Sequence, residues 1–112
     1  MRRLAGIALL LGLTASTALA CGTVQMWSDT YWRPAATDQN RQTALQQLTV
    51  LCGSQNNADA DRRLLAVLTD AEQRGYDRAL LRHVLETHRC LPSVPRTEGP
   101  ARLVAATGAR CP

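Results

Sequence analysis

The residues most able to do chemistry in this chain are its cysteines and histidines. They are Cys21, Cys52, Cys90, Cys111, His83 and His88. A zinc site built on cysteine usually contains closely spaced pairs such as CxxC, and no such pair is present. The two histidines are five positions apart, which places them about 140° apart around a helix, so they do not face one ligand. The sequence therefore predicts no metal site.

No catalytic arrangement accompanies these side chains. The patterns GxSxG, HExxH, P-loop, dinucleotide glycines and CxxCH are all absent, and neither histidine has a nucleophile in a local signature. We expect His83 on a helix surface and His88 partly buried. Asp59 and Asp61 form a carboxylate pair, but acidic residues in the first turn of a helix already interact favourably with its dipole. We predict that the protein is not an enzyme and uses no cofactor.

The first twenty residues have the three parts of a signal peptide. A positive start, Met1-Arg2-Arg3, is followed by the apolar run 7–13 and by small residues that end in Ala18-Leu19-Ala20. The uncharged stretch 4–20 is short for a membrane span. We expect cleavage after residue 20, and a protein that is periplasmic or secreted.

An even number of cysteines in an exported chain is typical of a disulfide framework. We therefore expect two disulfides, for which three pairings exist. Cys52 ends the first predicted helix and Cys90 the third, and these ends meet in an up-down-up bundle. The preferred pairing joins Cys52 to Cys90, which leaves Cys21 and Cys111 for each other.

Cys21 has a second interpretation, because bacterial lipoproteins are acylated on a cysteine at the first mature position. A lipobox prefers Leu third and a small residue second before that cysteine, whereas Ala18 and Leu19 stand the other way round. Acylation would also leave an odd number of thiols. We favour a protein without a lipid anchor, and an outer-membrane lipoprotein is the alternative. Membrane contact is expected only if Cys21 is acylated.

The charge of the mature chain does not indicate nucleic-acid binding. Residues 21–112 keep eleven of the thirteen arginines against all nine acidic residues, and there is no lysine. These arginines are scattered among Asp and Glu instead of forming a basic patch with interleaved aromatic residues.

The expected fold is all-α, a small three-helix bundle stapled by disulfides, in a single domain. After the signal peptide 1–20, residues 21–36 form an irregular lead segment, residues 37–91 the helical core and residues 92–112 a proline-rich tail. Apolar residues recur at three-to-four spacing throughout the core.

Helix ends are marked by caps and breakers. The first helix begins near Thr37 or Asp38 and runs to Cys52, where Gly53 stops it. The second begins near Asp59 and ends at Gly75. Asp77 caps the third, which Pro92 prevents from continuing. A last turn or two is expected over residues 101–106, and a bridged Cys111 would fix the tail.

The aromatic residues of the lead segment have two interpretations. Trp27, Tyr31 and Trp32 either pack on the helices or form an exposed anchor for a partner, since Trp and Tyr are enriched at binding hot spots. Core packing is preferred, because aromatic side chains bury large areas in a chain with few of them.

Several features together resemble the all-helical pilotins, small lipoproteins that escort secretin subunits to the outer membrane. They are the signal sequence, the first cysteine, a helix ending LTVLC at Cys52, a second helix closing AEQRGY at Tyr76, and a later cysteine. The resemblance implies a helical bundle with one disulfide, an acylated Cys21 and a groove for the C-terminal helix of the secretin. The weak lipobox and the extra Cys111 depart from that pattern.

Our first hypothesis is an exported periplasmic accessory or assembly protein that binds another protein, with a secretion-system component as a candidate. The alternative is a small secreted inhibitor, immunity-type or effector protein, and a weak enzyme or lysis factor comes third. A large apolar groove would favour the first, and a protruding aromatic loop around Trp27 to Trp32 the second. A histidine converging with a carboxylate would favour the third.

Overall fold

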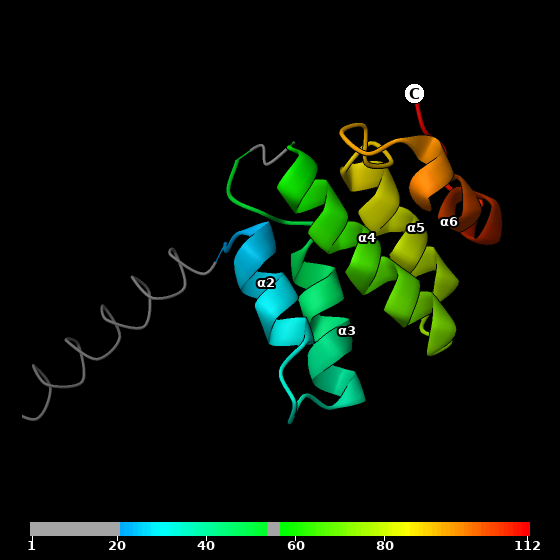
Figure 1. Cartoon of the computed structure of the whole chain (residues 1–112). Helices are drawn as coiled ribbons and strands as arrows, with labels where there is room; N and C mark the ends of the chain where they lie inside the picture. The colour runs from blue at the N-terminus through cyan, green and yellow to red at the C-terminus, as the bar shows by residue number, and fades with distance from the viewer. Residues whose placement is uncertain (1–20, 54–56) are drawn as a thin grey trace, which may run out of the picture.

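The computed structural model describes residues 21–53 and 57–112, and the predicted signal peptide lies outside the described residues. This part of the chain is all-α and contains no strand, as predicted, but it has five helices and one 3₁₀ turn (Figure 1). The elements are α2 (Val24–Tyr31), α3 (Asp38–Gln47), α4 (Ala58–Gln73), α5 (Arg78–Thr87), η1 (Arg96–Glu98) and α6 (Pro100–Thr107). The expectation of a three-helix bundle is therefore wrong in its number of helices.

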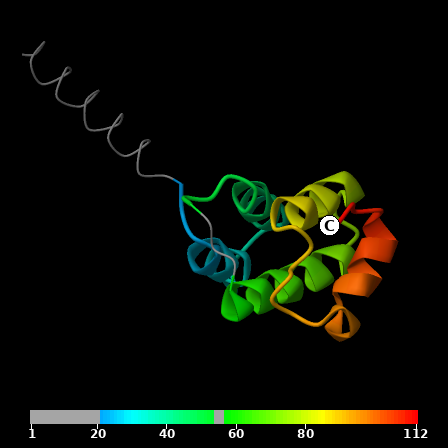
Figure 2. The ribbon, with the colours of Figure 1, turned by 90° about the horizontal axis from the view of Figure 1, so that it is seen from above.

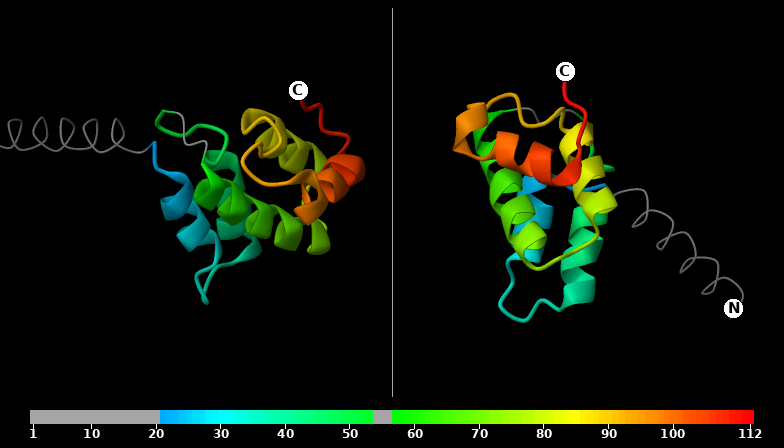
Figure 3. Two further views of the ribbon diagram at one scale, coloured as in Figure 1. Left: turned by 45° about the horizontal axis from the view of Figure 1, so that its top comes forward. Right: turned by 90° about the vertical axis from the view of Figure 1, so that its right-hand side faces the viewer.

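The helices form two rows that are closed at one end. Seen from above, α2 and α4 lie along one side, α3 and α5 along the other, and α6 crosses the end (Figure 2). The right-hand view of Figure 3 shows α6 lying across α4 and α5, against both of which it packs. No helix among the described residues is long and apolar enough to cross a membrane.

The lead segment 21–36 is not irregular as expected, because it contains α2. Thr23 caps this helix by accepting a hydrogen bond from the amide of Met26 at 3.1 Å. Its buried positions, Val24, Ser28 and Tyr31, repeat with helical spacing. Valine, threonine and aromatic residues are weak helix formers, so contact with α3 and α4 supplies much of the stability of this short helix.

Thr37 and Asp77 are helix caps as predicted, whereas the cap of α4 is Asn57, which was expected in a loop. Thr37 and Asn40 form a capping box at α3, Asn57 accepts a hydrogen bond from the amide of Ala60 in α4, and Asp77 does the same for Ala79 in α5. However, α3 ends at Gln47, well before Cys52. The β-branched residues Thr49 and Val50 follow soon after. The Thr49 hydroxyl donates a hydrogen bond to the carbonyl of Gln46 at 2.6 Å, which favours the end of the helix at this point.

The core lies where the two rows meet. Its largest fully buried side chains come from every α-helix and from the turn after α5: Val24, Tyr31, Leu45, Leu48, Leu64, Val67, Leu68, Leu81, Val84, Leu85, Leu91 and Leu103. Because α4 contacts α2, α5 and α6, it joins the two ends of the molecule.

All four cysteines form disulfides, but the expected pairing is wrong. Cys21 is bonded to Cys52 and Cys90 to Cys111, with Cα–Cα distances of 5.2 and 5.5 Å. Since α3 ends early, Cys52 belongs to a loop that returns to the start of α2, where its amide bonds the carbonyl of Gly22 at 3.3 Å. It is therefore beside Cys21 and not at a helix end.

The C-terminal ends of α3 and α5 do meet, as the bundle argument required. The contact is made by His88 instead of a disulfide, because its Nε2 lies 2.8 Å from the carbonyl oxygen of Leu48. His88 is buried, which agrees with its expected placement, and it ties the end of α5 to the end of α3.

Three residues in a row after α5 have left-handed backbone angles. The φ values of Arg89, Cys90 and Leu91 are 46°, 59° and 66°, a conformation that costs roughly 1–2 kcal/mol for each non-glycine residue. The amide of Cys90 bonds the carbonyl of Leu85 at 2.6 Å, and Leu91 is buried. This turn directs the chain from α5 toward α6.

The connection to α6 is fixed from α4. Asp61, in the first turn of α4, is completely buried, and its Oδ2 accepts a hydrogen bond from the amide of Ser93 at 2.8 Å. Pro100 then starts α6 at its first position, and Gly108 ends it with a φ of 73°. The predicted tail 92–112 is thus mostly ordered structure that Cys111 ties to the bundle.

Tryptic mapping without reduction tests this pairing. We expect the peptide 90–96 linked to residues 111–112, and the peptide 42–62, which contains Cys52, linked to the one that contains Cys21. A peptide in which 42–62 is joined to 90–96 would contradict the pairing. Acyl chains on the Cys21 sulfur would contradict it too, because that sulfur could not then bond Cys52.

Candidate functional site

The titratable residues considered for catalysis do not converge in the described part of the chain. His83 is exposed on α5, whereas His88 is buried. Asp59 is exposed and pairs with Arg63 at 2.9 Å, whereas Asp61 is buried beneath the Ser93 amide. No group of three or more His, Cys, Asp or Glu side chains in residues 21–53 and 57–112 could hold a metal ion.

The three aromatic residues predicted as core or anchor have different environments. Tyr31 is 1% exposed and belongs to the core, and Trp27 is half-buried against it. Trp32 is 47% exposed and stands edge-on to the Tyr31 ring, with a centroid distance of 5.1 Å. Met26 on the same helix is also exposed. The core interpretation therefore holds for Tyr31, and only Trp32 is available as an anchor.

A polar cluster ties α2 to α4 behind these rings. The Tyr31 hydroxyl donates to Asp70 Oδ2 at 2.7 Å, and Arg74 Nε donates to the same oxygen at 2.6 Å. Burial opposes ionisation of Asp70, but the hydrogen bonds from Arg74 and Tyr31 outweigh it and lower the pKa of this carboxyl. Burial and the bond to Asp70 raise the pKa of Tyr31 far above its ordinary value.

A second polar cluster joins α3 to the loop after α4. The Tyr76 hydroxyl donates to Asp38 Oδ1 at 2.5 Å, and Arg41 donates to both the Tyr76 oxygen and the same carboxylate. These hydrogen bonds, first from Tyr76 and then from Arg41, lower the pKa of Asp38. Every charged group here has a partner within the domain, so we interpret both clusters as structural.

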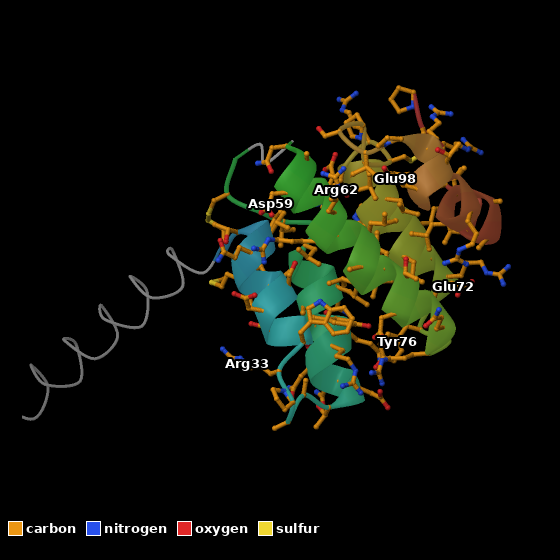
Figure 4. All side chains as sticks on the ribbon, in the orientation of Figure 1. Arg33, Asp59, Arg62, Glu72, Tyr76 and Glu98 are labelled. Carbon is orange, nitrogen blue, oxygen red and sulfur yellow. A yellow bond between two sulfur atoms is a disulfide. The ribbon has the colours of Figure 1, made fainter. Side chains whose placement is uncertain are left out.

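Ion pairs also fix the outer side of α4. Figure 4 shows Arg62 beside Glu98 of η1, with Asp59 near the start of the helix and Glu72 toward its far end. Arg62 Nη2 lies 3.8 Å from Glu98 Oε2, and Arg102 Nη1 of α6 lies 3.4 Å from Glu72 Oε1. Exposed pairs of this kind contribute roughly 0–1 kcal/mol each, so they position more than they stabilise.

A groove along α6 has a volume of about 520 Å³. We call it the α6 groove. Its lining residues come from the turn after α5, from η1, from α6 and from the C-terminal segment: Cys90, Arg96, Pro100, Ala101, Val104, Ala105, Ala109, Arg110 and Cys111. Most of these side chains are apolar and small. A second hollow, of about 390 Å³ beside Tyr76, is lined by charged residues such as Glu72, Asp77 and Arg78.

α6 is apolar on two sides, which explains the groove. Leu103 and Thr107 are buried against the bundle. Ala101, Val104 and Ala105 are three to four positions apart on the other side, where Ala101 and Ala105 are exposed. On this outer side of α6, Ala101 and Ala105 are therefore open to solvent, while Val104 is partly buried against the core.

The Cys90–Cys111 disulfide forms one wall of the groove. It joins the left-handed turn after α5 to the C-terminal segment, whose course is also fixed by a 2.7 Å hydrogen bond from the Arg110 amide to Glu86. One covalent and one polar contact thus fix the C-terminal segment that lines the groove. The groove was not predicted from the sequence. Ala101, Val104 and Ala105 have helical spacing, but the sequence does not show which side of that helix is buried.

Comparison of the chain with protein-family models, with curated proteins and with solved structures finds no match for any of the three. The resemblance to pilotins therefore stays a prediction, and the site is interpreted from its geometry alone.

The hydrogen bonds from Tyr31 and Arg74 to the Asp70 carboxylate predict a loss of stability in acid. Because its pKa is lowered in the folded state, the carboxylate stabilises the protein above its ordinary pKa near 3.8, and this contribution is lost as the pH falls through the folded value. Asp70→Asn should lower the free energy of unfolding at pH 7 by about 1.5–3 kcal/mol. It should also flatten the stability profile below about pH 4, measured by urea unfolding. If this variant loses stability in acid as the unmodified protein does, the hydrogen bonds from Tyr31 and Arg74 to Asp70 are not the source of the acid sensitivity.

Proposed function

We propose that the protein is an exported accessory protein that binds a segment of another protein in the α6 groove. The observation that carries this proposal is a mostly apolar groove of about 520 Å³ along α6, on which Ala101 and Ala105 are exposed to solvent. Apolar, water-exposed surfaces of this kind mark interaction sites on small soluble domains.

The two disulfides indicate an oxidising compartment outside the cytosol. This agrees with the predicted signal peptide, and we propose the periplasm or the cell exterior as the place of action. Since Cys21 is bonded to Cys52, a lipid on the same sulfur is incompatible with this disulfide. We therefore propose a protein without a lipid anchor.

A polypeptide suits the groove better than a small ligand. Small-molecule sites bury most of the surface of their ligand, whereas Ala101 and Ala105 lie open to solvent along one side of α6. An open groove contacts only one face of its ligand, and this suits a polypeptide segment that extends beyond both ends of the groove. Small side chains on the floor let a partner helix or extended strand approach closely.

The alternative of an inhibitor or effector has weaker support. It predicted a protruding aromatic loop around Trp27 to Trp32, but residues 24–31 form a helix whose Tyr31 is buried. The enzyme hypothesis required a histidine near a carboxylate in a cleft, and neither His83 nor His88 lines the α6 groove. A secretion-system component, which the pilotin resemblance implies, remains a candidate partner.

Site-specific photocrosslinking in the cell of origin tests the proposal. A photoreactive residue at Ala105, inside the groove, should trap one partner protein through one segment. The same residue at Ala35, in the loop between α2 and α3, should not trap it. Neither α2 nor α3 contacts α6, so Ala35 is a suitable control.

The trapped segment, made as a synthetic peptide, should bind the purified protein. Ala105→Gln places a larger neutral side chain in the groove and should weaken binding about tenfold or more, which is about 1.4 kcal/mol. Ala35→Gln should leave the affinity unchanged. Equal trapping at both positions, or equal affinity of both variants, would refute a binding site in the groove.

A further inference from the structure

The α6 groove carries positive charge and no negative charge on its lining. Arg96 and Arg110 are its charged residues, and no Asp or Glu lines it. Glu86 is the acidic side chain that touches this segment, and it accepts a hydrogen bond from the main-chain amide of Arg110 at 2.7 Å. It therefore binds the backbone and does not neutralise either guanidinium by an ion pair.

Both guanidinium groups are available to a ligand. Arg96 donates one hydrogen bond, to the main-chain oxygen of Pro112 at 3.1 Å. The Arg110 side chain has no hydrogen-bond or ion-pair partner among the described residues. A guanidinium has five donors in a planar fork that matches a carboxylate, so each arginine retains most of its capacity.

The wider charge distribution has the same sign. Residues 21–77 carry five arginines against seven acidic residues, whereas residues 78–112 carry six arginines against two. The arginines that have no acidic partner among the described residues are also concentrated in the second of these two parts. Arg33 is the one that precedes α5, and the others lie in α5 or after it. The latter are Arg78, Arg82, Arg89, Arg96 and Arg110. This end of the molecule therefore attracts acidic partners over distances near the Debye length.

We infer that the segment bound in the α6 groove is an acidic polypeptide, with an apolar stripe on Ala101, Val104 and Ala105 and carboxylates paired with Arg96 and Arg110. This inference rests on the proposed function, since it names the kind of partner for the same groove. Burial of small apolar side chains supplies contact area, and the two arginines select for carboxylates.

The same charge would also attract an anionic membrane surface, but the shape argues for a polypeptide. Binding to a bilayer uses large apolar side chains that insert between the lipids. In the described part of the chain, the exposed large apolar residues are Met26, Trp32 and Val50. They lie on or next to α2 and α3, and these helices do not contact α6. The groove itself is concave and is lined by small residues.

Three peptides that differ only in charge test the inference. Each is an amphipathic helix of about sixteen residues, roughly four turns, with one Leu and Ala stripe flanked by Glu, by Gln or by Lys. Binding to the full oxidised protein is measured by calorimetry and by NMR chemical-shift changes. The Glu peptide should bind at least about tenfold more tightly than the Gln peptide, and the Lys peptide more weakly still. The shifts should centre on Val104, Ala105 and Ala109.

A matched pair of double variants separates the groove from general attraction. Arg96→Gln/Arg110→Gln should abolish the preference for the Glu peptide. Arg33→Gln/Arg82→Gln removes the same charge from two arginines outside the groove and should keep it. About 0.3 M salt should reduce the preference but not reverse it.

Three results would overturn the inference. The first is equal binding of the Glu and Gln peptides, and the second is an equal effect of the two double variants. The third is binding to phosphatidylglycerol vesicles through Arg96 and Arg110 without binding to the Glu peptide. If the Gln peptide occupies the groove as well as the Glu peptide, the inference fails while the proposed function stands. The proposed function fails by its own tests, which are crosslinking that is no stronger at Ala105 than at Ala35, or equal affinity of Ala105→Gln and Ala35→Gln for the trapped segment.

Discussion

The Cys90–Cys111 disulfide is the constraint on which the C-terminal third of the molecule depends. An isolated helix as short as α6 is only marginally stable in water. Closing a loop of 21 residues restricts the unfolded chain, which corresponds to about 3 kcal/mol. This contribution is comparable to the cost of the left-handed turn at residues 89–91. The bond therefore lets the chain make an unfavourable turn and still place α6 across the end of the bundle.

Contacts from the rest of the fold complete this arrangement. The carboxylate of Asp61 binds the chain at Ser93, and His88 fixes the end of α5 to Leu48 of α3. At the other end of the bundle, the Cys21–Cys52 disulfide and the Tyr31–Asp70 hydrogen bond hold α2 against its neighbours. The acidic residues of that half are mostly paired with arginines. Unpaired positive charge is left near α6, where the uncovered apolar side also lies.

Much of the helical core could be predicted from the sequence, because its signals are local. The caps at Thr37 and Asp77, the stop at Gly75 and the apolar face of α5 depend on residues close together in the chain. The disulfide pairing could not be predicted, because it depends on where the loop after α3 leads. That loop returns to Gly22 since α3 ends at Gln47, and the preferred pairing assumed a longer helix.

The candidate site was harder to predict than the core. The aromatic residues drew attention because Trp and Tyr are frequent at interfaces, yet Tyr31 is buried and bonded to Asp70. The groove depends instead on Ala101, Val104 and Ala105, whose spacing was visible but whose environment was not. Only the tertiary structure shows that the Leu103 side of α6 is covered by the bundle while the other side is open.

The central claim is that the disulfide holds the α6 groove formed before any partner binds. Hydrogen exchange of the free, oxidised protein tests this claim most directly. The amides of α6 should be protected within about tenfold of those in α5, because both belong to one cooperative unit. Cys90→Ser/Cys111→Ser should abolish the protection of α6, and Cys21→Ser/Cys52→Ser should leave it in place. Free exchange of α6 in the intact protein, or unchanged protection without the Cys90–Cys111 bond, would contradict the account.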